Sequence, residues 1–312
     1  MTTTGVLVVG GGPAGLSAAI AAAGHGAATL LVDEGQMPGG QLTYRLADGA
    51  RETGARLRAE ASRAGVTIES RAVVWGLFAG SVAAISQNRE SRNVHFERVI
   101  LATGSTDRVV SFAGSSLPGV FTVRALQILM HRHRVLVGQR FAVIGSDANE
   151  ICIDIEASGG TVVVRDAGDR SERLTASGTG GVERLPIDGV EYDVDAIALA
   201  FGHVPDPRLA IMAECAVEPG ATPGAYVPWR DESLRTTNPA IFAAGDICGS
   251  GTIASMVAEG RLAGIGAAAS LGLVSKEDLE AEQRRFAEEA PERLRAAGAG
   301  QFVQFAGQGE WR

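Results

Sequence analysis

The sequence predicts an α/β fold in which a doubly wound parallel sheet is interrupted by a second, smaller domain of similar build. Two strand–turn–helix–strand segments carry this prediction, one starting at Val6 and the other at Phe141. The composition agrees, because 46% of the residues are hydrophobic and can form a folded core. Glycine is in excess, with 41 residues in 312 against a usual share of about 7%, and no collagen-like repeat is present.

The first forty residues form the β–α–β unit expected of a dinucleotide site. Val6–Val9 is an apolar strand, an alanine-rich helix covers Leu16–Ala23, and Ala28–Val32 is a second apolar strand. Asp33 and Glu34 follow this second strand. Either carboxylate can accept hydrogen bonds from the hydroxyls of an adenosine ribose.

The turn between the first strand and the helix reads Gly-Gly-Gly-Pro-Ala-Gly and has the spacing GxGxxG. Gly10 makes the tight turn, Gly12 lets backbone N–H groups approach a pyrophosphate, and Gly15 lets the helix pack closely on the strand. Pro13 and Ala14 belong to the same turn, at a helix N-terminus whose N–H groups and dipole favour an anion. Together with both strands and the acid, the pattern predicts dinucleotide binding.

Three later motifs combine a turn or a strand end with small residues. They read Pro-Gly-Gly-Gln-Leu at 38–42, Arg-Val-Ile-Leu-Ala-Thr-Gly at 98–104 and Thr-Asn-Pro-Ala-Ile-Phe-Ala-Ala-Gly-Asp at 237–246. Small residues at such places let the backbone approach a flat ligand. In this order the motifs resemble the FAD-dependent pyridine nucleotide-disulfide oxidoreductases, flavoproteins with two dinucleotide-binding domains, and the resemblance covers residues 5 to about 270.

The resemblance implies a doubly wound FAD-binding Rossmann-type domain with an inserted, shortened nicotinamide-like domain. It also implies that Gly40 and Gln41 lie along the isoalloxazine, and that Thr103 and Gly104 lie beside the flavin where the chain crosses between domains. Asp246 would hold a ribitol hydroxyl. The cofactor-binding residues predicted in this way are Gly10, Gly12, Pro13, Ala14, Gly15, Asp33, Glu34, Gly40, Gln41, Leu42, Val73, Ala102, Thr103, Gly104, Gly245, Asp246, Thr252 and Ile253.

Two of these positions have a more specific role in the implied site. A helix beginning near Thr252 would direct its N-terminus at the flavin pyrimidine, where the helix dipole stabilises negative charge on the reduced ring. The backbone near Val73, at a strand end, would suit the adenine edge.

Cysteine usage separates the chain from members that reduce thioredoxin or peroxide-linked partners. Cys152, Cys215 and Cys248 form no CxxC, so the internal redox disulfide of those members is absent, and a zinc site is not expected. Cys248 lies two residues after Asp246, and we interpret it as a small buried residue in a glycine-rich loop.

The second segment departs from the nucleotide-binding pattern. It retains Gly145, but Asp147 stands at the second glycine position and Glu150 at the third. Repulsion between a carboxylate and a pyrophosphate that lie ~4 Å apart costs on the order of 4 kcal/mol of binding free energy at an effective dielectric of ~20. Asp147 is the stronger obstacle, because similar members carry a glutamate a little further along this helix. Arg165 stands alone, without the second arginine for a 2′-phosphate, so we expect the NAD(P) site to be lost.

Three segments indicate a particular group within this family. Residues 102–108, 112–122 and 258–264 are similar to the α-type subunits of heteromeric amino-acid, opine, sarcosine and proline oxidoreductases, the group that includes hydrogen cyanide synthase. The resemblance implies that a second flavoprotein subunit is the partner, and that a small-molecule amine or amino acid is the substrate. Many α-type subunits carry an iron–sulfur cluster near the C-terminus, but no cysteine follows Cys248 here.

Our first hypothesis is therefore an FAD-binding subunit of a heteromeric oxidase or dye-linked dehydrogenase, with catalytic residues unassigned. A stand-alone FAD-dependent oxidase, or an NAD(P)H- or ferredoxin-linked reductase of the thioredoxin-reductase-like group, is the second. A non-catalytic scaffold that holds FAD is the third. The expected domains are 1–116 and 203–272 for FAD, 117–202 for the degenerate NAD(P)-like domain, and 273–312 for a C-terminal helix and tail.

Charge and hydropathy exclude other classes. The net charge of −8 argues against a nucleic-acid binder, which would present a basic face. No apolar run approaches the ~18 residues of a membrane span. The start lacks the basic segment of a signal peptide, and we expect a reduced, cytoplasmic setting and no metal site.

The C-terminal segment opens with Ser275–Asp278, a capping-box-like pattern that predicts a helix. Phe286, Phe302, Phe305 and Trp311 follow, an unusual share of the aromatic residues in this chain. Exposed aromatics are costly, since burying one large side chain is worth roughly 1.5–3 kcal/mol. Either the tail packs on its own body, or it docks onto a partner subunit.

Overall fold

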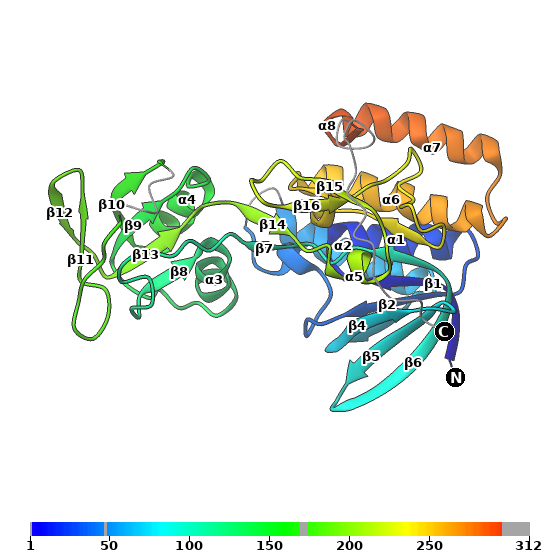
Figure 1. Ribbon diagram of the computed structural model, residues 1–312, viewed down its shortest axis with the longest axis horizontal. Coiled ribbons are helices and arrows are strands. Elements are labelled where there is room, and N and C mark those ends of the chain that lie inside the picture. Colours follow the sequence, from blue (N-terminus) through cyan, green and yellow to red (C-terminus); the bar gives the residue numbers. More distant parts are fainter. Residues whose placement is uncertain (1, 47–48, 169–173, 295–312) are drawn as a thin grey trace. The chain divides into compact units, whose positions relative to one another are not determined.

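The computed structural model describes residues 2–46, 49–168 and 174–294 (Figure 1). The chain divides into unit 1, which comprises Met1–Ser105 and Pro205–Arg312, and unit 2, which comprises Thr106–Val204. The first division lies earlier than the residue 116 expected from the sequence. The reason is that Val110 and Phe112 pack into the apolar core of unit 2. The tail aromatics Phe302, Phe305 and Trp311 lie outside the described residues.

Unit 1 is built on a seven-stranded sheet in the order β3-β2-β1-β6-β5-β4, with β17 paired to β6. The strands β3, β2, β1, β6 and β17 are mutually parallel, while β4 and β5 continue from β6 as antiparallel partners. The bounds are β1 (Thr2–Val9), β2 (Thr29–Asp33), β3 (Thr67–Ser70), β4 (Ala72–Phe78), β5 (Val82–Gln87), β6 (Glu90–Leu101) and β17 (Ile241–Ala243).

Alternation along β1 divides the interior of unit 1 into two cores. Val6 and Val8 face a core shared with the helices, and Leu7 and Val9 face a core shared with β4, β5 and α5. A parallel sheet has to be covered on both faces, and here antiparallel strands cover much of the second face. The helical elements of unit 1 are α1 (Pro13–Gly24), η1 (Gly40–Thr43), α2 (Ala50–Arg63), α5 (Arg208–Met212), η5 (Asp246–Cys248), α6 (Ile253–Ser270), α7 (Lys276–Glu289) and α8 (Pro291–Leu294).

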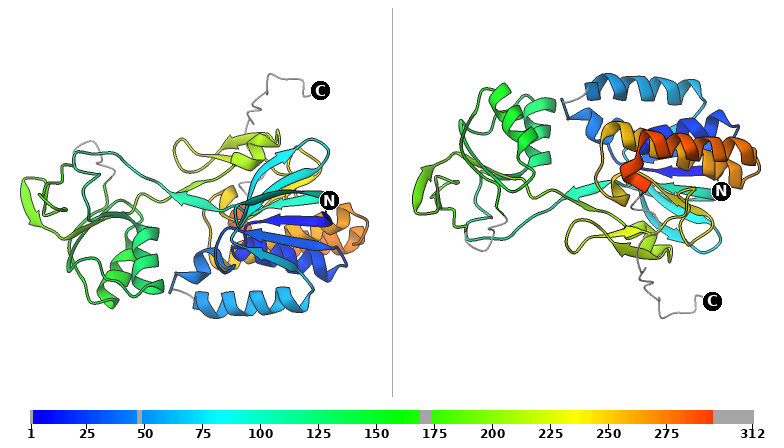
Figure 2. Two further views of the ribbon diagram at one scale, coloured as in Figure 1. Left: turned by 90° about the horizontal axis from the view of Figure 1, so that it is seen from below. Right: turned by 90° about the horizontal axis from the view of Figure 1, so that it is seen from above.

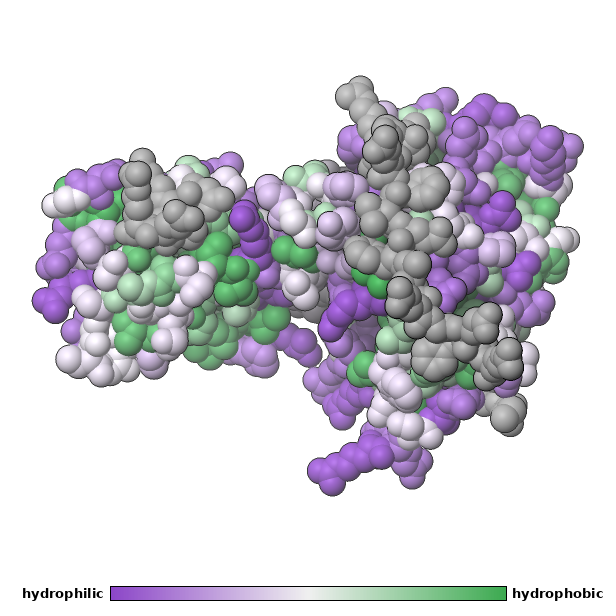
Figure 3. All heavy atoms as spheres, viewed as in Figure 1, coloured by the Kyte–Doolittle hydropathy of each residue, from purple (hydrophilic) through white to green (hydrophobic). Residues whose placement is uncertain are grey.

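The C-terminal helices pack on the outside of α6 (Figures 1 and 2). The predicted helix cap is confirmed, because the Ser275 hydroxyl accepts the backbone N–H of Asp278 at 3.1 Å. Phe286 is buried in the helical core, whereas the outward side of α7 is charged and hydrophilic (Figure 3). The small antiparallel pair β15 (Val217–Pro219) and β16 (Tyr226–Pro228) completes unit 1.

Unit 2 repeats the parallel α/β plan on a smaller scale, in the strand order β10-β9-β13-β8. Phe141 and Val143 of β9 face one core, and Ala142 and Ile144 face the other. The sequence prediction of an α/β fold with two parallel sheets is confirmed. The elements are β8 (Val120–Thr122), α3 (Val123–Gln127), the π-helix η3 (Ile128–Arg132), β9 (Arg140–Ile144), α4 (Asn149–Ala157), β10 (Thr161–Asp166), β11 (Arg184–Ile187), β12 (Val190–Asp193) and β13 (Ala196–Leu199), with β7 (Ser105–Asp107) and β14 (His203–Pro205) as the paired connecting strands.

Helices α1 and α6 approach each other through glycine. A Cβ at Gly264 would lie 2.3 Å from the backbone oxygen of Ala18 and 2.8 Å from the Cβ of Ala21. Both contacts are closer than atoms tolerate, so a side chain at Gly264 would force the helices apart. The Ala- and Gly-rich sequences of α1 and α6 are therefore a packing requirement as well as a composition bias.

Replacing Gly264 by alanine should lower the free energy of unfolding by about 1–3 kcal/mol, the usual cost of overpacking. Urea denaturation followed by circular dichroism measures this change. Gly24→Ala is the matched control, because Gly24 ends α1, the helix that packs against α6, and nothing lies within 4 Å of its Cβ position. The control should keep or gain up to ~1 kcal/mol through helix propensity. Equal effects of the two variants would contradict the packing argument.

Candidate functional site

The predicted motifs meet at one edge of the unit 1 sheet. Strands β1, β6 and β17 are parallel and end at Val9, Leu101 and Ala243. The glycine turn, the residues around Thr103 and the loop containing Asp246 follow these three strand ends directly. In open α/β sheets, ligands bind outside the carboxyl ends of the strands, so the topology gathers the motifs where a cofactor is expected.

The glycine turn packs tightly on one side. Gly10 has φ +99°, and a Cβ there would lie 2.3 Å from the carbonyl oxygen of Ala102. A Cβ at Gly15 would lie 1.8 Å from the carbonyl oxygen of Gly10, so neither position can carry a side chain. These contacts fix the first turn of α1 against β6 and explain two of the three glycines by packing.

Gly12 differs from the other two motif glycines. It has φ −68° and ψ −172°, a conformation open to other residues, and nothing lies within 4 Å of its Cβ position. Open space therefore lies beside the N-terminus of α1, where backbone N–H groups attract anions. Pro13 occupies the first helical position, and Ala14 is buried behind it. The turn has the shape and the polarity that the diphosphate of a dinucleotide requires.

The two acids after β2 have different environments. The carboxylate of Asp33 accepts hydrogen bonds from the backbone N–H of Gly11 at 2.5 Å and of Gly35 at 2.8 Å. Asp33 therefore ties the glycine turn to the loop after β2. Glu34 is exposed at the same strand end.

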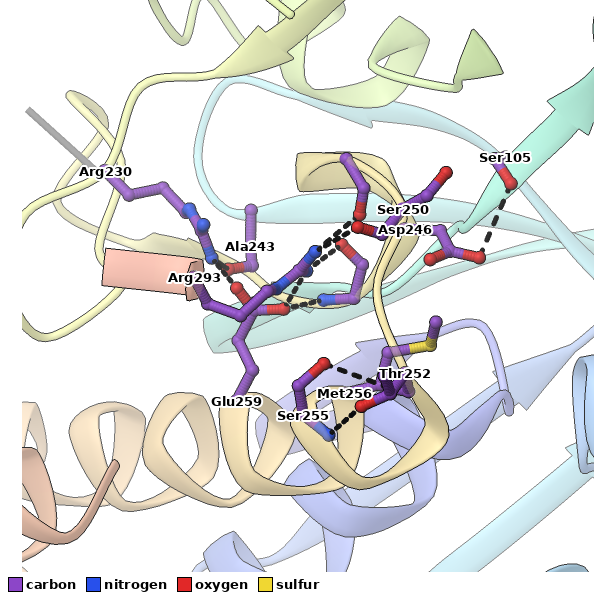
Figure 4. Close-up of polar contacts among 12 residues, drawn as sticks. Ser105, Arg230, Ala243, Asp246, Ser250, Thr252, Ser255, Met256, Glu259 and Arg293 are labelled. Carbon is purple, nitrogen blue, oxygen red and sulfur yellow. Dashed lines mark hydrogen bonds and ion pairs between the residues drawn. The ribbon is translucent and has the colours of Figure 1, made fainter. Parts of the chain in front are cut away.

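A second group of predicted residues comes together around Asp246. The side-chain amide of Gln41 lies 3.4 Å from Asp246 Oδ2 and 3.1 Å from Met256 Sδ, although these residues are more than 200 positions apart. The hydroxyl of Ser105 lies 3.5 Å from Asp246 Oδ2 (Figure 4). Gln41 also accepts from Arg45 at 2.7 Å. Polar groups from two distant segments, Gln41 and Ser105, thus converge on the Asp246 carboxylate.

Gly40 connects this group with the glycine turn, because a Cβ at Gly40 would lie 3.0 Å from the Cα of Gly12. The hydroxyl of Thr103 donates to the backbone oxygen of Asp206 at 2.9 Å, next to Gly104, whose φ is +75°. These residues bring the predicted motifs of unit 1 to one place. Leu42 is buried in the helical core and is 1% exposed.

Three predicted residues lie on regular elements of unit 1. Thr252 caps α6, and its hydroxyl accepts the backbone N–H of Ser255 at 3.1 Å (Figure 4). Ile253 is the first residue of that helix and is buried. Val73 lies on β4, paired with Ser86, and is 44% exposed.

Burial of Cys248 determines the protonation state of its thiol. Removal from water raises the pKa of the Cys248 thiol to about 12, so the thiol remains protonated. The residue is 4% exposed and packs into the second core of unit 1. The interpretation of Cys248 as a buried structural residue is confirmed.

Sequence reasoning missed a buried ionic group behind the Asp246 loop. Glu259 of α6 lies between Arg230 and Arg293, and the three side chains are 0%, 2% and 5% exposed (Figure 4). Burial acts to raise the pKa of Glu259, but the two guanidinium groups outweigh it and lower the pKa, so the carboxylate stays ionised. The one signal of this group in the sequence was an acid within Ile253–Ser270, where most residues are small or apolar.

The corresponding turn of unit 2 repeats the close contact of the first glycine but carries different side chains. Gly145 has φ +123°, and a Cβ there would lie 2.3 Å from the oxygen of Ala200, the same distance as at Gly10. The backbone N–H of Asp147 donates to that Ala200 oxygen at 2.9 Å. Glu150 accepts from Gln127 at 3.1 Å.

Two features are absent from the part of the chain that the structure describes. Among residues 2–46, 49–168 and 174–294, no group of three or more His, Cys, Asp and Glu side chains is arranged to hold a metal ion. Within the same ranges, no helix combines the length and the apolar character needed to cross a bilayer.

A largely parallel sheet with a glycine turn at its carboxyl edge, interrupted by a second parallel sheet, is the architecture of a two-domain oxidoreductase of the Rossmann type. Residues 4–172 match the family model described as pyridine nucleotide-disulphide oxidoreductase. The match covers more than half of the chain, which therefore belongs to this family.

Known proteins resemble the chain over most of its length. The A subunit of opine oxidase from Rhizobium meliloti (strain 1021) is 27% identical over 334 residues, which cover 87% of this chain and 72% of the relative. The alpha subunit of sarcosine oxidase from the same organism is 28% identical over 66% of this chain but 25% of its own length. The crystal structure of L-proline dehydrogenase from P. horikoshii superposes with a TM-score of 0.78 at 24% identity, over 91% of this chain and 59% of that chain. The last comparison is a likeness of fold.

The different environments of Asp33 and Glu34 lead to a stability prediction. Asp33→Asn leaves one of two backbone N–H groups without a proper acceptor, and should lower the free energy of unfolding by about 1–2 kcal/mol. Glu34→Gln should change it by less than ~0.5 kcal/mol, as is usual at exposed positions. Urea denaturation of the cofactor-free chain checks both values. A loss at Glu34 equal to that at Asp33 would show that the assignment of the two roles is wrong.

Proposed function

We propose that the chain is an FAD-binding subunit of a heteromeric oxidoreductase that acts on an amino acid, an opine or a related secondary amine. The observation that carries this proposal is the open space at Gly12, in front of α1, with Asp33, Gln41 and Asp246 gathered around it. The residues present fit FAD, because a Cβ-free backbone faces the pyrophosphate position and a carboxylate lies at each end of the site.

Each end of the proposed site has its own residues. The N–H groups at the start of α1 hold the pyrophosphate, and Glu34 binds the adenosine ribose. Asp246 and Gln41 bind the ribityl end, where the amide of Gln41 lies 3.4 Å from the Asp246 carboxylate. The capped N-terminus of α6 at Thr252 presents its dipole to the flavin pyrimidine. FAD, when bound, supplies the two-electron chemistry, and the chain supplies position and electrostatics.

We propose that the second turn does not bind NAD(P). The N–H of Asp147, which would face a pyrophosphate, donates to Ala200 at 2.9 Å. The Asp147 carboxylate adds a like charge that is worth on the order of 4 kcal/mol at 4 Å and an effective dielectric of ~20. Arg165 donates to Asn149 Oδ1 at 2.5 Å instead of facing a 2′-phosphate. These contacts support the proposal that unit 2 has the fold of a nucleotide-binding domain but does not bind NAD(P).

The names of the similar proteins support a secondary amine as the class of substrate. Opines and sarcosine, from which two relatives take their names, are secondary amines, as is proline. Oxidation of such an amine to an imine removes a hydride and a proton, and the hydride requires an acceptor such as a flavin. We assign the amine oxidation to a second flavoprotein subunit, because the polar side chains gathered at the proposed site of this chain are those that bind a cofactor. The role of this chain is then to relay electrons through its own FAD.

Gly12→Asp tests the location of the FAD site. The variant introduces into the first turn the residue that the second turn carries at Asp147. A like charge beside the pyrophosphate should raise the Kd for FAD by about a thousandfold. The melting temperature of the FAD-free chain should not change, because Gly12 has an unrestricted φ of −68° and nothing within 4 Å.

FAD titration followed by flavin fluorescence measures the effect. Gly180→Asp is the matched control, since Gly180 also has open space at its Cβ position and lies in unit 2. Unchanged FAD affinity in the Gly12→Asp chain would place the cofactor elsewhere.

Reduction experiments separate a relay subunit from a reductase. The FAD-loaded chain, kept without oxygen, should not lose its flavin absorbance on mixing with NADH or NADPH in a stopped-flow instrument. Mixing with a secondary amine should bleach the flavin when the native partner is present. Rapid bleaching by either nicotinamide nucleotide would contradict the proposed loss of the second site and favour a stand-alone reductase.

A further inference from the structure

The buried ionic group Arg230, Glu259 and Arg293 holds the backbone of the loop that carries Asp246. Glu259 Oε1 accepts from Arg230 at 2.6 Å, and Glu259 Oε2 accepts the backbone N–H of Gly245 at 2.6 Å. Arg293 forms an ion pair with the same Oε2 atom. The arginines come from a loop and from α8, so three distant segments meet behind one turn (Figure 4).

The arginines also bind carbonyl groups along this loop. Arg293 donates to the backbone oxygens of Gly245 at 2.9 Å, Gly249 at 2.6 Å and Ser250 at 3.3 Å. Arg230 donates to the oxygen of Ala243 at 3.0 Å, at the end of β17. Both ends of the loop and the strand before it are therefore held by buried guanidinium groups.

The loop needs such support because its conformation is unusual. Gly245 has φ 85° and ψ −156°, and Gly249 has φ 105° and ψ 157°, a region that glycine alone populates. The 3₁₀ turn between them, Asp246–Cys248, has two backbone hydrogen bonds of its own, from Cys248 N at 2.8 Å and Gly249 N at 3.1 Å. Short glycine-flanked turns with few internal bonds do not hold one conformation by themselves.

A gain in folding stability does not by itself explain why charged residues occupy this buried position behind the Asp246 loop. Replacing a buried ion pair by apolar residues of similar volume is often neutral or stabilising, because the charges lose their hydration. A guanidinium group is planar and rigid, and it points several N–H donors in fixed directions. Arg293 uses these donors on three carbonyls and one carboxylate, which is an arrangement that fixes backbone geometry.

The C-terminal helices bring Arg293 to this position. Helix α7 is anchored on α6 by the buried Phe286 and by Arg261, which donates to Glu282 at 2.5 Å and to Glu289 at 2.6 Å. Helix α8 follows directly and places Arg293 inside the protein, 4% exposed. The described C-terminal segment is thereby coupled to the Asp246 loop.

We propose that Arg293 and Glu259 are positioning residues for the FAD site, which hold the Gly245–Ser250 loop in the conformation that presents Asp246 to the cofactor. This inference rests on the proposed function, because it takes the Asp246 loop as part of the FAD site. Neither residue touches the reacting atoms. Without Arg293, the loop has to be ordered when FAD binds, and that ordering weakens the affinity.

The test compares Arg293→Met with Arg285→Met in the full-length chain. Arg285 lies on α7 with a 58% exposed side chain paired to Glu289, so the control removes the same charge from the same C-terminal segment. Flavin fluorescence gives the Kd for FAD, and amide hydrogen exchange of the FAD-free chain reports on Cys248 and Gly249. Arg293→Met should raise the Kd by about tenfold or more, the cost of ordering a few residues. It should also speed exchange in the loop, while Arg285→Met should change neither.

Arg293→Lys separates positioning from general destabilisation. One ammonium group can reach some of the four acceptors, so its FAD affinity and loop exchange should fall between the wild type and Arg293→Met. Addition of free guanidinium to an Arg293→Ala chain should restore part of the affinity, which a general loss of stability would not allow. If Arg293→Met does not fold, Arg293→Lys and the rescued Arg293→Ala chain carry the test.

Two outcomes would overturn the inference, and they are distinguishable. A wild-type chain that does not bind FAD would overturn the proposed function together with this inference. A wild-type chain that binds FAD, with Arg293 variants that bind it equally well and exchange their loop amides at the wild-type rate, would overturn the positioning role alone.

Discussion

The close packing of the first turn of α1 is the constraint on which unit 1 depends. From one side, Gly15 and Gly10 bring this turn against β6, so closely that a Cβ at Gly10 would lie 2.3 Å from the oxygen of Ala102. From the other side, a Cβ at Gly260 of α6 would lie 2.1 Å from the oxygen of Ala14, and one at Gly245 would lie 2.8 Å from the Ala14 Cβ. Strands, helix and the Asp246 loop can converge only because these positions carry no side chain.

The two glycine turns of the chain show why a fold and a function have to be argued separately. Gly10 and Gly145 make the same close approach at the end of a neighbouring strand, and each lies between a parallel strand and the helix that follows it. The difference lies at the next position of the motif, where Gly12 leaves open space and Asp147 brings a carboxylate. The two turns therefore share the strand–turn–helix plan but present different groups at this position.

Local patterns explain what the sequence could predict. The glycine turns, the apolar strand Val6–Val9 and the cap at Ser275 depend on residues a few positions apart, and all of them match the structure. The predicted grouping of Gln41 with Asp246 required the family resemblance, because no local rule joins residues that far apart. The ionic group of Arg230, Glu259 and Arg293 was missed for the same reason, since its three members meet only in the folded chain. The division into units after Ser105 also depends on distant contacts, because Val110 packs into the core of unit 2.

The central claim is that the chain has one working dinucleotide site, in unit 1, and that this site takes FAD. Equilibrium dialysis of the purified chain against FAD and against NADH and NADPH tests the claim most directly, because it counts bound nucleotide without depending on a substrate. We expect one FAD per chain and no bound NADH or NADPH. Stoichiometric binding of either nicotinamide nucleotide, or a chain that retains no FAD, would contradict the account.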